Sequence, residues 1–225
     1  KIAADGSGGA IVTWNDTRSP ITSADIYAQH VMSSGIVDSA WPVNGRALCL
    51  ATRDQLNPTI TSDGAHGAIV TWEDFRDGIF HIFAQRVLGS GAIASVWPAD
   101  GRAVCTAPIG QKEPILISDG ANGAIVTWKD LRNGGNFVPF AQHVRASSAI
   151  DPAWPVNGTA LTRSTGNQTN ASIVTDGAGG AIVAWEEDTF IFAQHVRASG
   201  TLDPEFSVNG RLVRPILTFQ QDPDL

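Results

Sequence analysis

The chain repeats one pattern of apolar and polar positions four times. The strongest block reads Asp-Gly-x-x-Gly-Ala-Ile-Val-x-Trp and starts at Asp5, Asp63, Asp119 and Asp176. The tryptophans that end this block are Trp14, Trp72, Trp128 and Trp185, spaced 58, 56 and 57 residues apart. A fixed period of this length is typical of stacked supersecondary units. We therefore predict four repeats, over approximately residues 1–58, 59–114, 115–171 and 172–225.

Each repeat contains four strand-like segments, which in the second repeat run over residues 58–62, 67–72, 79–87 and 102–106. Asp63-Gly64 separates the first two segments, because Asp can bond the backbone ahead of it and Gly takes a positive φ. In the second segment, one face carries Ala68, Val70 and Trp72, and the other carries Ile69 and Thr71. Both faces are therefore apolar or nearly so. Such a strand must be covered on both sides.

A lone four-stranded sheet cannot cover both of its faces. Sheets stacked face to face around an axis can, because each covers its neighbour. No apolar stripe with the period of a helix competes with this interpretation. We therefore predict an all-β fold, a β-propeller of four-stranded antiparallel blades, with four blades formed by residues 1–225 as one domain. The four repeated tryptophans should be buried between the blades.

The chain begins and ends inside the same strand of the repeat, since Lys1-Ile2 and Asp224-Leu225 both align with Thr59-Ile60. This register favours a segment of a longer protein or of a multichain ring. The alternative is a closed ring of four blades, in which Ile2 would pair with Pro223. An open arc would expose the apolar faces of its end blades, so other blades, other subunits or a surface partner would have to cover them.

Composition limits the partners and the redox chemistry. The net charge is −7 and the pI is near 5.1, with no basic stripe, which argues against nucleic-acid binding. No apolar run approaches about 18 residues, so no membrane insertion is expected. Cys49 and Cys105 occupy the same position in successive repeats, and equivalent atoms of neighbouring blades are usually too far apart for a disulfide. We interpret them as buried free thiols, with a disulfide or a metal pair as the alternative.

The repeat resembles those of bacterial secreted propeller proteins, which carry tandem DGxGGAIVxWED and IYAQxV segments. Here the corresponding segments include DGAHGAIVTWED from Asp63 and IYAQHV from Ile26. The chain is also distantly similar to sialidase-type propellers with Asp-box turns, although the spacing from Asp63 to Trp72 departs from theirs. The resemblance to the secreted proteins implies an extracellular or cell-surface location in a bacterium.

Several repeated polar residues could carry chemistry, but their recurrence favours structural roles. An Asp-x-Arg element follows three of the four tryptophans, at Asp16, Asp74 and Asp130, and is lost after Glu186. It predicts a loop clasp. The acidic pairs at Glu73 and Glu186 could serve glycosidic chemistry, but adjacent strand residues point to opposite faces. The equivalent His30, His143 and His195 are interrupted by Arg86, so hydrogen-bonded histidines between blades are favoured over a metal ring.

Two groups of residues remain as candidate binding sites. In a propeller, the loops between second and third strands and the loops between blades emerge on one face, and such variable loops usually set specificity. The candidate residues of this loop face are Arg18, Arg53, Arg76, Lys112, Arg132, Asn133, Asn136 and Asn167. Trp41, Trp97 and Trp154 each precede a proline near a turn, where an indole could stack on a sugar ring or could pack on its own blade.

These patterns favour a non-enzymatic secreted or cell-surface protein that acts as a structural or binding scaffold, for a protein or a glycan partner. The alternative is a carbohydrate-acting module, either a lectin or a propeller segment of a glycosidase or lyase. We assign no catalytic residue, no metal site and no cofactor, because no phosphate loop, nucleophile elbow or metal-ligand motif is present in the sequence. An enzyme should show a polar cluster on the axis that is not repeated from blade to blade.

Overall fold

The protein folds entirely as β-sheet in a computed structural model that describes residues 1–132 and 135–215. The first sheet contains β1 (Ile2–Ala4), β2 (Ala10–Asp16), β3 (Asp25–Val31) and β4 (Arg46–Cys49). The second contains β5 (Gln55–Ser62), β6 (Ala68–Asp74), β7 (His81–Val87) and β8 (Arg102–Cys105). The third contains β9 (Gln111–Ser118), β10 (Ala124–Asp130), β11 (Val138–Val144) and β12 (Thr159–Ala160). The fourth contains β13 (Gln168–Thr175), β14 (Ala181–Glu187), β15 (Phe190–Val196) and β16 (Arg211–Pro215).

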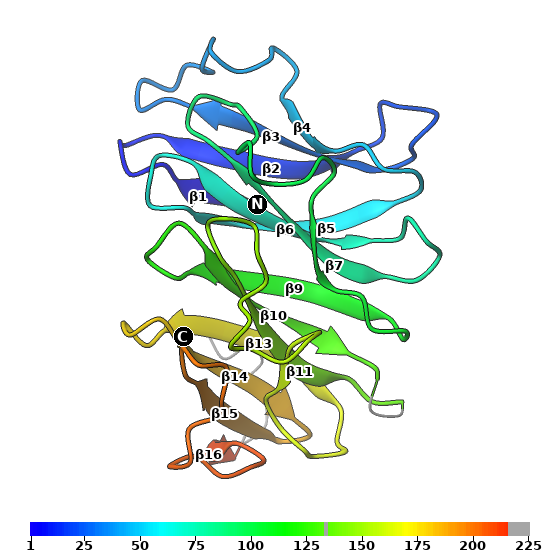
Figure 1. Ribbon diagram of the computed structural model, residues 1–225, viewed down its shortest axis with the longest axis vertical. Helices are drawn as coiled ribbons and strands as arrows, with labels where there is room; N and C mark the ends of the chain where they lie inside the picture. The colour runs from blue at the N-terminus through cyan, green and yellow to red at the C-terminus, as the bar shows by residue number, and fades with distance from the viewer. Residues whose placement is uncertain (133–134, 216–225) are drawn as a thin grey trace.

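Each sheet is an antiparallel meander whose strands follow chain order. The four sheets are the blades of a β-propeller, as predicted, and they stack one after another along the long axis of the molecule (Figure 1). The innermost strands β1, β5, β9 and β13 contact one another in that order. The later sheets begin at Gln55, Gln111 and Gln168, four residues before the predicted repeat boundaries.

The first and last sheets lie at opposite ends of the stack (Figure 1). The described residues therefore form an open arc of four blades. Pro223, whose pairing with Ile2 would mark a closed ring, lies outside the described residues.

The repeated Asp-Gly-x-x-Gly block forms the turn between the first and second strands of each blade. In the second blade, Oδ1 of Asp63 accepts hydrogen bonds from the backbone N–H groups of Ala65 and Gly67, each at 2.8 Å. Gly67 is required there because a Cβ atom would lie 2.4 Å from the carbonyl oxygen of Val87. The sequence block thus encodes a tight turn that lies against the end of the third strand.

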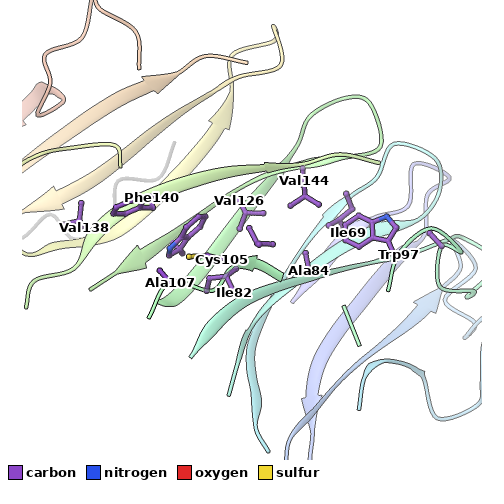
Figure 2. Close-up of a cluster of buried hydrophobic side chains, with 14 residues drawn as sticks. Ile69, Ile82, Ala84, Trp97, Cys105, Ala107, Val126, Val138, Phe140 and Val144 are labelled. Carbon is purple, nitrogen blue, oxygen red and sulfur yellow. The ribbon is translucent and has the colours of Figure 1, made fainter. Parts of the chain in front are cut away.

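The apolar core lies between the sheets. Figure 2 shows the cluster between the second and third blades, in which Ile69, Ile82 and Trp97 come from the second blade and Val126 and Val144 from the third. Equivalent clusters join the first blade to the second and the third to the fourth. All seven residues of β6 are buried, which confirms that this strand is covered on both faces.

Both cysteines are buried free thiols, as predicted. Burial raises the pKa of the Cys105 thiol to about 11, and burial also raises the pKa of Cys49. Both side chains therefore stay protonated at neutral pH and are poor nucleophiles.

Residues 1–132 and 135–215 contain no helix that could span a membrane.

Candidate functional site

Three of the four loop arginines, Arg18, Arg76 and Arg132, form clasps within their own blades. Arg76 donates from Nε to Oδ1 of Asp74 (2.7 Å) and from Nη2 to the carbonyl oxygen of Asp100 (2.7 Å). Its guanidinium also lies 4.0 Å from the centre of the Phe83 ring. Arg18 and Arg132 clasp their preceding aspartates in the same way. The hydrogen bond from Arg18 holds the pKa of Asp16 well below its usual range.

In the fourth blade the clasp is absent. Glu187 stands where the other blades have the aspartate, and its carboxylate bonds the hydroxyl of Ser164. The buried Nε1 of Trp185 consequently has no partner in the described part of the chain, whereas Nε1 of Trp72 donates to Asp74 at 2.8 Å. The aspartate of the Asp-x-Arg element therefore accepts a hydrogen bond from the buried tryptophan as well as from the loop arginine.

The three tryptophans considered for sugar stacking are buried wedges between blades. Trp41, Trp97 and Trp154 are each 3–4% exposed. Their Nε1 groups donate at 3.0 Å to backbone carbonyls of the next blade, those of Gly89, Ala146 and Ala198. This placement leaves no indole face open to a sugar ring, and it corrects the stacking interpretation. The alternative of packing on the same blade holds in part, because the Trp41 ring also lies 6.0 Å from the His30 ring of its own blade and the Trp154 ring 6.2 Å from that of His143.

The remaining loop candidates do not converge on one site. Lys112 lies 5.0 Å from the centre of the Phe80 ring. Nδ2 of Asn136 donates to the carbonyl of Thr165 at 2.6 Å, and Oδ1 of Asn167 accepts from the backbone N–H of Phe137. Asn133 lies outside the described residues.

Arg53 lines a hollow of about 470 Å³ on the loop face, between the first and second blades. Its guanidinium lies 5.9 Å from the centre of the Phe75 ring, which forms another wall of the hollow. The neighbouring Asp54 carboxylate already accepts hydrogen bonds from the Ser23 hydroxyl and the Ala24 backbone. Asp54 therefore connects the two blades, while Arg53 packs within the second.

The repeated histidines link two aspartates within one blade. His143 binds Asp119 through Nε2 and Asp151 through Nδ1, both at 2.8 Å. His30 and His195 make the same pair of contacts in the first and fourth blades. These histidine clamps correct the interpretation of hydrogen bonds between blades. In the described ranges, no group of three His, Cys, Asp or Glu residues is placed to hold a metal ion.

A second cavity, of about 260 Å³, lies where the innermost strands of the blades meet. We call it the axial cavity. Its lining residues are Lys1, Asn57, Thr59, Glu113, Pro114, Ile115, Lys129, Asn170 and Ala171. They come from all four blades, which distinguishes this cavity from the hollow on the loop face.

The innermost strands of the last three blades each contain an irregularity that shapes the cavity. The register of β5 against β6 shifts between Leu56 and Thr59, and Asn57 in this bulge has φ +52°. Glu113 (φ +52°) and Asn170 (φ +50°) occupy the same position in β9 and β13. A bulge re-aims the side chain that it contains. Here the three re-aimed side chains line one cavity.

The polar groups of the axial cavity differ from blade to blade. The carboxylate of Glu113 lies 2.6 Å from Nζ of Lys129. Its backbone N–H donates to Oε1 of Glu73 in the preceding blade at 2.8 Å. Asn170 donates from Nδ2 to Oε2 of Glu186 at 2.9 Å. The exposed Asn57 amide makes no hydrogen bond within the described part of the protein, so both ends of this amide are free for a ligand.

Sequence reasoning missed Asn57, Glu113, Lys129 and Asn170. The signal that could have found them is variation at two positions within a constant repeat. The residue after the repeated tryptophan is Asn15, Glu73, Lys129 or Glu186, while the residues around it stay nearly constant. The bulge position is Asn57, Glu113 or Asn170. The structure brings these two variable positions together at the axis.

Comparison with known protein families and with curated proteins finds no match. Among solved structures, the chain is similar to an endo-arabinase from Bacteroides thetaiotaomicron VPI-5482, with 12% identity, a TM-score of 0.46 and coverage of 96% of this chain and 73% of the other. It is also similar to a glycosyl hydrolase from Bacteroides ovatus, with 9% identity, a TM-score of 0.35 and coverage of 95% and 85%.

Both of these proteins are named as enzymes, and this finding corrects the prediction that the chain is not an enzyme. At such low identity the likeness concerns the fold, and neither activity is carried over to this chain.

Proposed function

We propose that this chain binds a carbohydrate in the axial cavity. The observation that carries the proposal is the polar cluster there, to which the third blade contributes an ion pair that no other described blade has. A carboxylate, an ammonium group and two amides line one cavity, from Glu113, Lys129, Asn57 and Asn170. Such groups can donate to and accept from the neighbouring hydroxyls of a sugar ring.

The same cavity has an apolar part, supplied by Pro114, Ile115 and Ala171. Ligand sites generally combine apolar walls with a few well-placed polar groups. A sugar ring has both kinds of surface, because its hydroxyls project from the rim and its C–H bonds form the faces. Glu113 and Lys129 balance each other's charge, so we favour a neutral oligosaccharide, with Lys1 as a further hydrogen-bond donor at the edge of the cavity. The repeats' resemblance to those of bacterial secreted proteins supports an extracellular setting for this ligand.

The test is a binding titration with a panel of neutral oligosaccharides that includes arabinan fragments. Glu113→Gln and Lys129→Met each remove one half of the axial ion pair and should weaken binding at least about tenfold, or about 1.4 kcal/mol. Glu205→Gln changes an exposed carboxylate on an outer loop and should bind like the wild type. Release of new reducing ends in the same samples would extend binding to hydrolysis, for which carboxylates are the usual catalytic groups.

Thermal unfolding of each variant separates loss of binding from loss of folding. Glu113 is exposed at the cavity, so the glutamine variant should unfold near the wild-type temperature. The proposal is wrong if no oligosaccharide of the panel binds, or if both axial variants bind as tightly as the Glu205→Gln control.

A further inference from the structure

The first blade exposes a face that the other blades bury. We define its leading face by Ala10, Val12, Trp14, Tyr27 and Val31, all of which are only partly buried. The equivalent residues of the second blade are between 0% and 8% exposed, because the first blade packs on them. These equivalents are Ala68, Val70, Trp72, Phe83 and Val87. The leading face of the first blade therefore has the apolar character of a covered face, but no blade packs on it among residues 1–132 and 135–215.

The fourth blade exposes the opposite face. We define its trailing face by Ile182, Ile191, Phe206 and Val213, of which Val213 is 60% exposed. In the first blade the equivalent Ile11, Ile26, Trp41 and Leu48 are buried against the second blade. The second blade buries Ile69, Ile82, Trp97 and Val104 against the third in the same way.

An empty socket on the first blade marks where a neighbour would dock. In the second blade, a Cβ atom on Gly91 would lie 2.9 Å from the indole of Trp41, because that ring packs directly on the glycine. In the fourth blade, Gly200 is covered by Trp154 with a corresponding distance of 2.6 Å. The equivalent Gly35 of the first blade has nothing within 4 Å. An aromatic ring of a preceding blade would fill that space.

We propose that the trailing face of one copy of this chain docks on the leading face of a second copy. The contact would repeat the packing that already joins the four blades three times within the chain. Phe206 of one copy would lie over Gly35 of the next. Phe206 supplies the ring but lacks the indole N–H, so this contact has one hydrogen bond fewer than the internal ones.

A polar contact between blades supports the same docking. Nε of Arg46 donates to the carbonyl oxygen of Gly91 in the next blade at 2.6 Å. Arg211 is its equivalent in the fourth blade, and its exposed side chain donates to the carbonyl of Glu205 and lies 5.6 Å from the centre of the Phe206 ring, both in its own blade. In the docked pair, Arg211 would be able to reach the carbonyl of Gly35.

The docking contact uses two different surfaces, so it is heterologous, and such contacts form rings when the rotation closes. Two copies that dock at both ends would make a ring of eight blades, which lies within the usual range for propellers. This inference concerns a surface other than the axial cavity and does not depend on carbohydrate binding.

Sedimentation velocity over a wide range of protein concentration tests the proposal. The wild type should shift from monomer to dimer as its concentration rises. Val12→Glu on the leading face and Val213→Glu on the trailing face should each weaken the dimer at least about 100-fold, because each would bury an unpaired charge. Val156→Glu is the matched control, since Val156 is 87% exposed on an outer loop.

Mixing the two face variants distinguishes head-to-tail docking from other dimers. Each variant keeps one intact face, so an equimolar mixture should recover a dimer that neither variant forms alone. A symmetric contact through one face would instead be lost in one variant only. A wild type that stays monomeric at all concentrations, or a mixture that recovers no dimer, would overturn the proposal.

Discussion

Replacing Trp72 by alanine should lower the free energy of unfolding by about 3–5 kcal/mol, the usual cost of truncating a fully buried aromatic side chain. The ring is 0% exposed and lies between the first and second blades. It contacts Phe83 within its own blade, with the ring centres 6.4 Å apart. A Cβ atom on Gly101 would lie 2.6 Å from the indole, so the backbone leaves no room for the ring to shift. Urea unfolding of the purified variant measures this effect.

Trp14 provides the matched control within the same chain. It has the same contacts inside its blade, with Nε1 donating to Asp16 at 2.8 Å and the Tyr27 ring centre at 6.2 Å. It differs in that no blade of the described part of the chain packs over it, and it is only partly buried. In the monomer, Trp14→Ala should therefore lower the free energy of unfolding less than Trp72→Ala does. The difference measures the contribution of burial between blades. Equal costs for the two variants would show that contacts between blades contribute little.

Raising the pH from about 6 to 9 should lower the stability of this protein, because three histidine clamps lose their protons. Burial opposes a charged imidazole at His143, but the hydrogen bonds to Asp119 and Asp151 outweigh it and raise the pKa. The pKa values of His30 and His195 are raised by their own aspartate pairs against the same opposition from burial. A raised pKa in the folded state means that the stabilisation is complete below the pKa of the unfolded histidine, about 6.5. It is lost as the pH rises through the folded value.

The aspartates of the clamps have the opposite dependence. The pKa of Asp203 is lowered to about 2, first by the backbone hydrogen bond from Glu205 and also by His195 and Arg197. A lowered pKa contributes stability above the unfolded value, about 3.9, and this contribution is lost as the pH falls through the folded one. The clamps should therefore stabilise the fold most between about pH 4 and pH 6.5.

The second blade suggests a variant that tests whether the histidine clamps cause the pH dependence of stability. There Arg86 replaces the histidine and bonds Asp63 at 2.8 Å, while Ala94 replaces the second aspartate. Arginine stays charged throughout this pH range. The double substitution His143→Arg with Asp151→Ala should remove about one third of the loss of stability that the clamps cause above pH 6.5. The three clamps are separate, so their effects should add. Urea unfolding at several pH values measures the slope. An unchanged slope in this variant would mean that the clamps do not cause the pH dependence.

The features of the fold that repeat could be predicted from the sequence. The turn at Asp63, the strand that is covered on both faces and the buried Trp72 each recur at fixed spacing, so the four copies of the pattern support one another. The two buried thiols followed from the same logic, because equivalent positions of neighbouring blades are far apart. The loss of the clasp in the fourth blade was also visible, since Glu187 breaks the Asp-x-Arg pattern.

The axial site could not be predicted in this way, because it depends on how different repeats meet in space. Asn57, Glu113 and Asn170 come from three different repeats, and the bulge that aims each of them at the axis is marked in the sequence only by the variation at this position. The direction in which Trp41 points could not be predicted either, because a Trp-Pro pair occurs in exposed turns as well as at positions buried between blades. Its acceptor, the carbonyl of Gly89, belongs to the next repeat and lies 48 residues away.

A crystal structure of the protein with the tightest-binding oligosaccharide would show whether the axial cavity is the ligand site. We predict a sugar ring in the axial cavity, in contact with Asn57, Glu113 and Lys129, with an apolar face against Pro114. A sugar bound on the loop face near Arg53 and Phe75, with the axial cavity free of ligand, would contradict this prediction.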